Sequence, residues 1–279
     1  MVRIVVDSGC DLSAEARQAI TGIELISVPL TLTVDGYDYL DDNALDVSAY
    51  LKHAESSALG PTTAAPSPHL YLDAYASDGS VFVVTLSSKL SASFESACLA
   101  ARLRADQFMG ALTHVFDSLS SSVGETLIAM KIADLVRNKL TDEDLVTQVE
   151  HFITNMNTFF ILDNFDTAVR TGRMSRVAAT MAEFLHIKPI CAGVEGEMKV
   201  VGKARNYQKA VKQLIKMMKD RTDDFSERIL AISHVEAEQK ALATQAEILA
   251  EIPFKDSFIT STGGLCSTYA SRGGIILAF

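Results

Sequence analysis

The sequence predicts an α/β protein in two parts, the first built around a parallel β-sheet and the second around a mixed one. In the first part, three apolar strands each end in small polar residues and lead into a helix; they are Arg3–Val6, Val81–Leu86 and Leu112–Phe116. Strands that alternate with helices favour a three-layer α/β/α domain with a parallel sheet. In the second part a hairpin and two terminal strands interrupt this alternation, which predicts a two-layer α/β domain with a mixed sheet.

The boundary between the two domains is expected near Asn155–Thr158, where the last helix of the first part ends. The domains would then cover residues 1–156 and 157–279. A chain of 279 residues is long enough for one large domain or two modest ones, and it can bury a sizeable core.

The segment after the first strand and helix reads as a further pair of strands. Glu24–Val28 and Leu30–Val34 are strand-like, and Asp35-Gly36 is a turn signal. An aromatic and acidic segment, Tyr37–Asp42, comes next, and a short helix is expected from Val47 to Ser57.

A proline-rich loop precedes the second α/β unit. Three of the nine residues 60–68 are prolines, and they prevent a helix before Pro68, which suits a first helical turn. They hold Thr62 and Thr63 in a stiff, extended loop. These hydroxyls are either solvated loop groups or ligand-binding groups presented at low entropic cost.

The stretch Val81–Met109 reads as a buried strand, a serine-rich turn and an amphipathic helix. Ser91 or Ser93 is a natural N-cap of that helix. Hydroxyls and free backbone N–H groups therefore meet beyond the carboxyl end of a strand, where α/β proteins bind ligands and where anions are favoured. Helix capping, ligand binding and a serine nucleophile all remain open at this turn.

The rest of the chain is assigned by the same patterns. A second serine-rich turn follows Asp117-Ser118. The remaining expected helices are Val123–Leu140, Glu143–Asn155, Val177–His186, Tyr207–Arg221 and Glu236–Glu251. The remaining expected strands are Thr158–Leu162, the hairpin Ile187–Val194 with Met198–Lys203, Ile229–Ser233, Phe258–Thr260 and Gly274–Phe279. Arg170 and Arg173 are three residues apart and form either a surface pair or a fork that binds an oxyanion.

Composition excludes several classes of function. The formal charge of −10 argues against nucleic acid and anionic membrane surfaces as partners, and no apolar run approaches the ~20 residues of a membrane span. The four cysteines lack paired metal spacing, and His234 has no second ligand cluster, so no metal site is predicted.

The N-terminus goes directly into a strand, without a signal peptide, which predicts a cytoplasmic protein. Without a phosphate-binding loop, a kinase acting alone is not expected.

Six segments, in this order and spacing, resemble the DegV family, bacterial proteins that bind fatty acids and present them to a separate acyl kinase. The segments are Asp7-Ser8, Pro61-Thr62-Thr63, Ser87–Ala97, Asp117-Ser118, Arg170–Ser175 and Ile187–Ile190. The resemblance covers essentially the whole chain.

The resemblance implies a long-chain fatty acid buried between the two domains, with no cofactor and no enzymatic activity of the chain itself. Its carboxylate would be held by Ser93, with Thr62 and Thr63 beside it, and with Ala92 and Ser118 in the same site. The acyl chain would thread into the second domain; the residues expected around it are Phe160, Met181, Phe184 and Ile190. Arg170 and Arg173 would lie near the carboxylate and contact the partner kinase.

Three features depart from the family pattern. Many members have glutamine after the threonine pair, where this chain has Ala64-Ala65. The family often has glycine where Ala92 stands. Many members also carry a histidine in a C-terminal glycine-rich motif, whereas Ser261–Gly274 has none, and Tyr269 or Arg272 is a candidate replacement. The competing hypothesis is a serine hydrolase acting on lipid esters, with Ser93 as its nucleophile.

Overall fold

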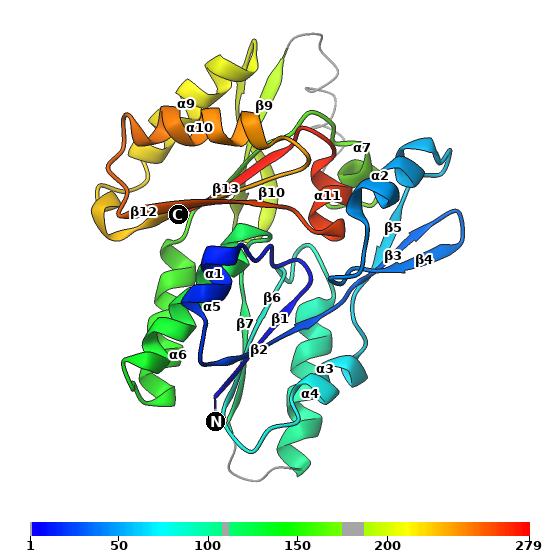
Figure 1. Cartoon of the computed structure of the whole chain (residues 1–279), viewed down its shortest axis with the longest axis vertical. Coiled ribbons are helices and arrows are strands. Elements are labelled where there is room, and N and C mark those ends of the chain that lie inside the picture. Colours follow the sequence, from blue (N-terminus) through cyan, green and yellow to red (C-terminus); the bar gives the residue numbers. More distant parts are fainter. Residues whose placement is uncertain (1, 108–111, 175–186) are drawn as a thin grey trace.

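A computed structural model describes residues 2–107, 112–174 and 187–279 of the chain, and in this part the strands form three sheets (Figure 1). Two of the sheets are the parallel and mixed sheets predicted from the sequence, so the α/β fold class is confirmed. The helix expected over Val177–His186, which carries Met181 and Phe184, lies outside the described residues.

Sheet A is the parallel sheet. Its strands are, in spatial order, β2 (Glu24–Val28), β1 (Arg3–Asp7), β6 (Val81–Thr85) and β7 (Thr113–Asp117). Because successive side chains of a strand point to opposite faces, Ile4 and Val6 pack with one set of helices and Val5 with another. The first set is α5 (Val123–Arg137) and α6 (Asp142–Asn155); the second is α3 (Pro68–Ala74) and α4 (Ser93–Gln107). This gives the predicted three layers.

Sheet B is a small antiparallel sheet that the sequence had not predicted as a unit. Its strands are β4 (Tyr37–Leu40), β3 (Thr31–Val34) and β5 (Thr62–Ala64). Asp35 and Gly36 both have positive φ, 48° and 82°, as a tight hairpin turn requires. The expected extended loop at Thr62-Thr63 is thus a paired strand, and its alternation exposes Thr62 while Thr63 is half-buried. Helix α1 (Ala14–Ala19) precedes this region and α2 (Val47–Ser56) packs beside it.

Sheet C is the mixed sheet. Its strands are, in spatial order, β10 (Glu197–Ala204), β9 (Lys188–Val194), β8 (Thr158–Ile161), β13 (Ile275–Ala278), β11 (Ile229–His234) and β12 (Asp256–Ser261). Only the β11–β12 pair is parallel among these described pairings. Helices α9 (Tyr207–Lys219) and α10 (Glu238–Leu249) cover one face and bury one core cluster there. Three short helices complete this part: α7 (Asp166–Arg170), η1 (Phe225–Glu227) and α11 (Gly264–Ala270).

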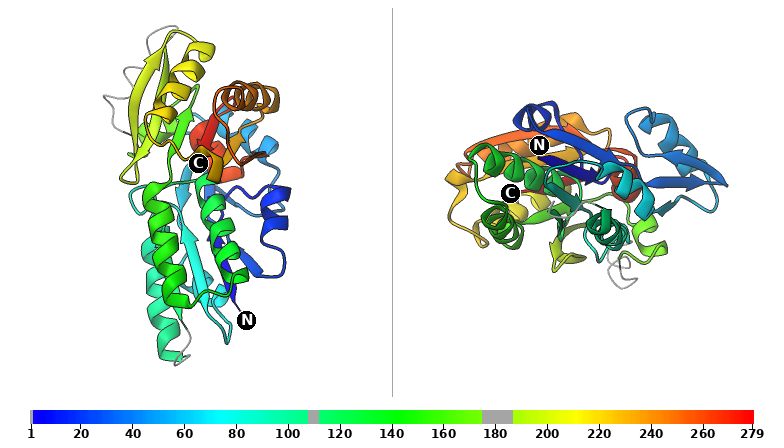
Figure 2. Two further views of the ribbon diagram at one scale, coloured as in Figure 1. Left: turned by 90° about the vertical axis from the view of Figure 1, so that its left-hand side faces the viewer. Right: turned by 90° about the horizontal axis from the view of Figure 1, so that it is seen from below.

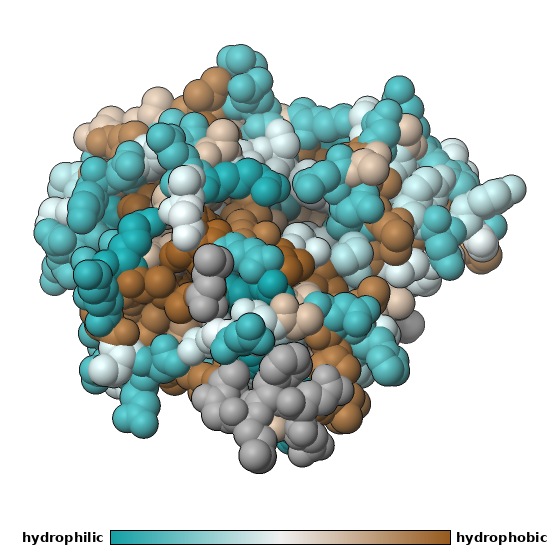
Figure 3. All heavy atoms as spheres, turned by 60° about the horizontal axis from the view of Figure 1, so that its bottom comes forward, coloured by the Kyte–Doolittle hydropathy of each residue, from teal (hydrophilic) through white to brown (hydrophobic). Residues whose placement is uncertain are grey.

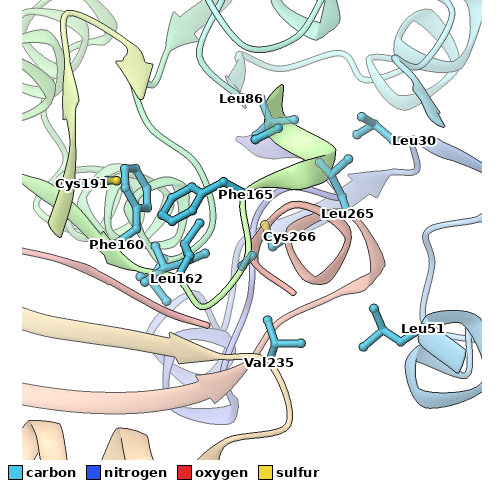
Figure 4. Packing of buried hydrophobic residues seen from close by; sticks show 14 of the residues in the cluster. Leu30, Leu51, Leu86, Phe160, Leu162, Phe165, Cys191, Val235, Leu265 and Cys266 are labelled. Atoms are coloured by element: carbon cyan, nitrogen blue, oxygen red, sulfur yellow. The ribbon is translucent and has the colours of Figure 1, made fainter. Parts of the chain in front are cut away.

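The two halves of the chain meet along the other face of sheet C (Figure 2). There one core cluster combines side chains from both halves, and Figure 4 shows Leu30 and Leu86 of the N-terminal half beside Leu265 of the C-terminal half. Sheets A and B use strands before residue 118, and sheet C uses strands from residue 158 onward. The division into two domains near residue 156 stays a prediction.

Candidate binding cavity

A cavity of about 230 Å³ lies where the two halves meet. Most of its wall is apolar and comes from sheets B and C, the β6–α4 turn and α11. The apolar lining side chains are Leu30, Ala65, Leu86, Leu90, Ala92, Phe160, Leu162, Met198, Leu265, Ala270 and Ile276. Such a wall favours an apolar ligand, because transferring each buried methylene from water contributes roughly 0.8 kcal/mol.

A small set of polar groups also lines this cavity: Thr63, Ser91, Ser121, Arg173 and Tyr269, together with the thiol of Cys266. The hydroxyls of Thr63 and Tyr269 are hydrogen-bonded to each other at 2.8 Å across the two halves of the chain. An apolar cavity with a few polar groups is the usual form of a small-molecule site, since those groups fix the ligand's orientation.

Arg173 and Arg170 have different surroundings. The Nε of Arg173 donates to the carbonyl of Leu90 at 3.0 Å, and its Nη1 donates to the carbonyl of Thr171 at 2.7 Å. Its guanidinium therefore sits against the β6–α4 turn and lines the cavity. Arg170 is exposed and donates to the carbonyls of Leu59 and Pro61, so it holds the segment that leads into β5.

The β6–α4 turn is fixed by the buried carboxyl of Asp7. This carboxyl accepts hydrogen bonds from the backbone N–H of Leu86 at 2.9 Å and from the Ser93 hydroxyl at 2.5 Å. Burial raises the pKa of Asp7, and the bond from Ser93 partly offsets that rise. The Ser93 hydroxyl is also 2.6 Å from the Tyr71 hydroxyl. Ser93 is fully buried and does not line the cavity, which instead receives Ser91 and Ala92.

This geometry does not support the serine hydrolase hypothesis. The side-chain partners of the Ser93 hydroxyl are a carboxylate and a phenol rather than a histidine, and the side chain is closed off from the cavity. A nucleophilic serine needs an adjacent base and access to substrate. Helix α4 begins at Ser93, so Ala92 and neither serine occupies the N-cap position; the Ser91 Oγ, one residue further out, accepts from the backbone N–H of Ser93 at 3.2 Å.

We expect Ser93→Ala to destabilise the protein by about 1–3 kcal/mol, because it leaves the buried Asp7 carboxyl without one of its donors. Urea denaturation measures this loss. A fluorophosphonate probe should label neither the wild type nor the variant, and Ser91→Ala, at the edge of the same turn, is the control with a smaller loss. Labelling of the wild type that Ser93→Ala abolishes would contradict this structural role.

Two other residues expected in the site lie elsewhere. The Ser118 hydroxyl is buried and donates to the carbonyl of Ser120 at 3.1 Å, so it braces the second serine turn, and Ser121 faces the cavity instead. Ile190 packs with the core cluster beneath α9 and α10, whereas its neighbour Cys191 points to the cavity side with Phe160. Strand alternation separates them, and the sequence alone does not say which face of β9 points inward.

Helix α11 supplies cavity residues that sequence patterns had missed. Its start is held by two buried carboxyls of the N-terminal half: Asp11 accepts from the Gly263 N–H at 2.6 Å, and Asp41 accepts from the Gly264 N–H at 2.7 Å. Burial raises the pKa of Asp11 to about 7. A Cβ on Gly264 would lie 2.4 Å from Leu45 and 2.7 Å from Asp41 and Leu32, so any larger residue would have to displace these side chains. The four-residue spacing of Leu265 and Tyr269 is the signal that could have indicated the helix.

The described residues contain neither a metal-binding cluster nor a membrane-spanning helix. No group of three or more His, Cys, Asp and Glu side chains among them is placed to hold a metal ion. No helix in the same ranges is both long and apolar enough to cross a membrane.

Comparison with known proteins identifies the family. Residues 1–279 match the model described as "Uncharacterised protein, DegV family". The chain belongs to the DegV family. This confirms the resemblance found in the sequence motifs, and it extends over the whole chain.

Solved structures of DegV proteins are similar to this chain along its full length. A DegV family protein from Ruminococcus gnavus, refined with vaccenic acid, is 32% identical with a TM-score of 0.94, covering 100% of this chain and 99% of that one. One from Eubacterium eligens, loaded with heptadecanoic acid, is 29% identical with a TM-score of 0.92 and the same coverage. The fatty acid kinase (Fak) B3 protein of Streptococcus pneumoniae, loaded with linoleic acid, is 27% identical, with a TM-score of 0.92 and again the same coverage.

Proposed function

We propose that this DegV protein binds a long-chain fatty acid in the cavity between its two halves and presents the carboxylate to a separate kinase. The observation that carries the proposal is the cavity itself: an apolar wall built by both halves, with hydroxyls and Arg173 among its lining groups. Three similar DegV structures hold fatty acids. Because the separate kinase would supply the groups for phosphoryl transfer, the chain itself acts as a carrier and needs no cofactor of its own.

The carboxylate would lie beside the β6–α4 turn. Ser91 and Ala92 stand immediately before α4, so an anion there meets a hydroxyl and the positive end of the helix dipole, a setting that typically contributes ~0.3–1 kcal/mol. The Thr63–Tyr269 pair adds two hydroxyls and Arg173 adds a charge. In this arrangement Tyr269, which lines the cavity, would take the role of the family histidine. Thr62, Ser93 and Ser118 support the site without touching the ligand.

The acyl chain would run along the apolar wall, past Phe160 and Leu162 of the C-terminal half and Leu86 of the N-terminal half. Long chains are favoured, because affinity grows by roughly 0.8 kcal/mol with each buried methylene. The polar groups then set the direction of the ligand rather than most of its affinity.

The kinase step would use the bound carboxylate as phosphoryl acceptor. Arg170, exposed beside the loop that leads into β5, would contact the kinase, and Arg173, three residues further on, lines the cavity. An ATP-using partner places this activity in the cytoplasm.

Native mass spectrometry of the purified protein tests the proposal. We expect loss of an acyl mass of roughly C14–C18 on denaturation, the length class whose methylenes bind strongly enough to survive purification. Delipidated protein should take up oleate or palmitate in a one-to-one ratio. Protein that is purified without lipid and takes up neither acid would contradict the proposal.

A further inference from the structure

Helix α11 belongs to the C-terminal half by chain order, but the N-terminal half holds it along its length. Both oxygens of the Asp41 carboxyl accept hydrogen bonds from its first turn, from the Gly264 N–H at 2.7 Å and from the Leu265 N–H at 3.0 Å. One turn later, the Thr268 hydroxyl is hydrogen-bonded to the Tyr50 hydroxyl at 2.7 Å. A helix of seven residues is too short to be stable alone, so its position depends on such contacts.

These contacts come from sheet B and from the helix beside it. Asp41 directly follows β4, and its own N–H donates to the carbonyl of Leu30 at 3.0 Å, which fixes the carboxyl relative to the sheet. Tyr50 lies on α2, which packs against α11 (Figure 1). We call sheet B together with α2 the cradle of α11.

The cradle packs its apolar side chains beneath α11. Leu32 of β3 and Leu51 of α2 are buried in the core cluster that also contains Leu265 of α11. In Figure 3 the hairpin of sheet B forms the right-hand edge of the molecule, and the surface there has mainly hydrophilic and intermediate colours. The cradle therefore holds α11 both by packing and by hydrogen bonds.

The other end of α11 places Tyr269 at the cavity. Tyr269 lies one helical turn after Leu265, and both side chains line the cavity. The Tyr269 hydroxyl is 2.8 Å from the hydroxyl of Thr63, which lies on β5 of the cradle. The cradle thus contacts α11 at its first turn through Asp41 and again at the cavity wall through Thr63. A displacement of the first turn would move the Tyr269 hydroxyl away from its place beside Thr63.

A carboxylate at position 41 satisfies both N–H groups of α11, and an amide would not. An ionised carboxylate is an acceptor at both oxygens, whereas asparagine has one carbonyl oxygen and an NH2 group that donates. In Asp41→Asn one of the two N–H groups would therefore face another donor. Asp41 is 5% exposed, so water cannot readily replace the lost acceptor. The positive end of the helix dipole also favours the carboxylate.

We propose that the cradle positions α11 for fatty-acid recognition, with Asp41 as its principal positioning residue and Tyr269 as the group that meets the ligand carboxylate beside Thr63. This inference rests on the proposed function. Asp41 acts through α11, because it is not among the residues that line the cavity. Sheet B, which sequence patterns had not predicted as a unit, thereby has a role in recognition of the ligand's polar end.

A double-mutant cycle tests whether Asp41 acts through Tyr269. Asp41→Asn, Tyr269→Phe and the double variant are delipidated, and the dissociation constants of oleate and of methyl oleate are measured for each. Asp42→Asn is the matched control, because this exposed carboxyl accepts from the N–H of Ala44 rather than from α11. Native mass spectrometry and the thermal midpoint show that each variant is lipid-free and folded.

We expect Asp41→Asn to weaken oleate binding about tenfold, the effect of losing one hydrogen bond to a charged group, and to change methyl oleate binding much less. Tyr269→Phe should show the same pattern. Adding Asp41→Asn to Tyr269→Phe should cause little further loss, because both changes remove the same interaction with the carboxylate. Asp42→Asn should match the wild type.

The contrary results separate the two proposals. The positioning role alone is overturned if Asp41→Asn binds oleate like the wild type, if it weakens both ligands equally, or if the losses in the cycle are additive. If Asp41→Asn does not fold, Tyr50→Phe replaces it in the cycle, because it removes one hydrogen bond between the cradle and α11 and carries the same expectations. Wild-type protein that takes up no oleate overturns the proposed function as well.

Discussion

Replacing Arg173 with glutamine is expected to weaken fatty-acid binding by about tenfold to a hundredfold, because a charge-assisted hydrogen bond to a carboxylate contributes roughly 1.5–3 kcal/mol. Arg173 is the cationic side chain among the residues that line the cavity, and its bonds to the carbonyls of Leu90 and Thr171 fix the position of its guanidinium. Titration of delipidated protein with oleate measures the change in dissociation constant.

Two comparisons separate charge recognition from loss of structure. Methyl oleate has the same acyl chain without the charge, so its binding should change much less than that of oleate when Arg173 is replaced. Arg170→Gln removes an equivalent side chain that bonds to backbone carbonyls outside the cavity, and oleate affinity should stay close to that of the wild type. If Arg173→Gln weakens both ligands equally, Arg173 supports the turn and does not bind the carboxylate.

The fold class and the serine-rich turn could be predicted because their signals are local. A buried run such as Val81–Thr85 followed by serines and an amphipathic helix has one common interpretation, and the order of such units fixes the parallel sheet. Asp35-Gly36 and Glu195-Gly196 likewise have the positive φ angles of tight hairpin turns. These features depend on neighbours in sequence, so the residues themselves carry the information.

Which of two neighbouring residues lines the cavity could not be predicted, because this depends on contacts with residues distant in sequence. Ser91 and Ser93 have the same chemistry, but the carboxyl of Asp7, 86 residues away, binds the Ser93 hydroxyl, and the cavity receives Ser91. Thr62 and Thr63 are separated in the same way by the pairing of β5 with β3. Helix α11 is short and begins with glycine, so its contribution to the cavity depends on Asp11 and Asp41 holding its first N–H groups.

Glu125 gives the second large prediction, on stability. It lies near the start of α5, fully buried, with its carboxyl group beside the carboxyl of Asp7 and without a bond from an N–H or hydroxyl donor of the described residues. Burial raises its pKa well above the ordinary 4.5, and the charge of Asp7 raises it further. The folded protein therefore keeps Glu125 protonated at pH values where the unfolded chain ionises it.

The direction of the pH effect follows from that difference. Below the pKa of Glu125 in the unfolded chain, the folded and unfolded states both hold the proton. Glu125 then gives the free energy of unfolding no dependence on pH. As the pH rises above it, the free energy of unfolding falls by up to ~1.4 kcal/mol per pH unit until the folded pKa is reached. Asp11, with a pKa of about 7, adds a similar loss up to that pH. Glu125→Gln keeps the volume and removes the ionisation, so it should be more stable than the wild type at neutral pH.

Urea denaturation between about pH 5 and about pH 8 measures the effect. We expect the stability difference between Glu125→Gln and the wild type to grow with pH, while Glu95→Gln, at an exposed position of α4, runs parallel to the wild type. The free energy of unfolding of Glu125→Gln should still fall as the pH rises, but less steeply than that of the wild type, because Asp11 still titrates in the variant. Parallel curves for Glu125→Gln and the wild type would mean that Glu125 is ionised in the folded protein, and that a buried donor outside the described contacts stabilises its charge.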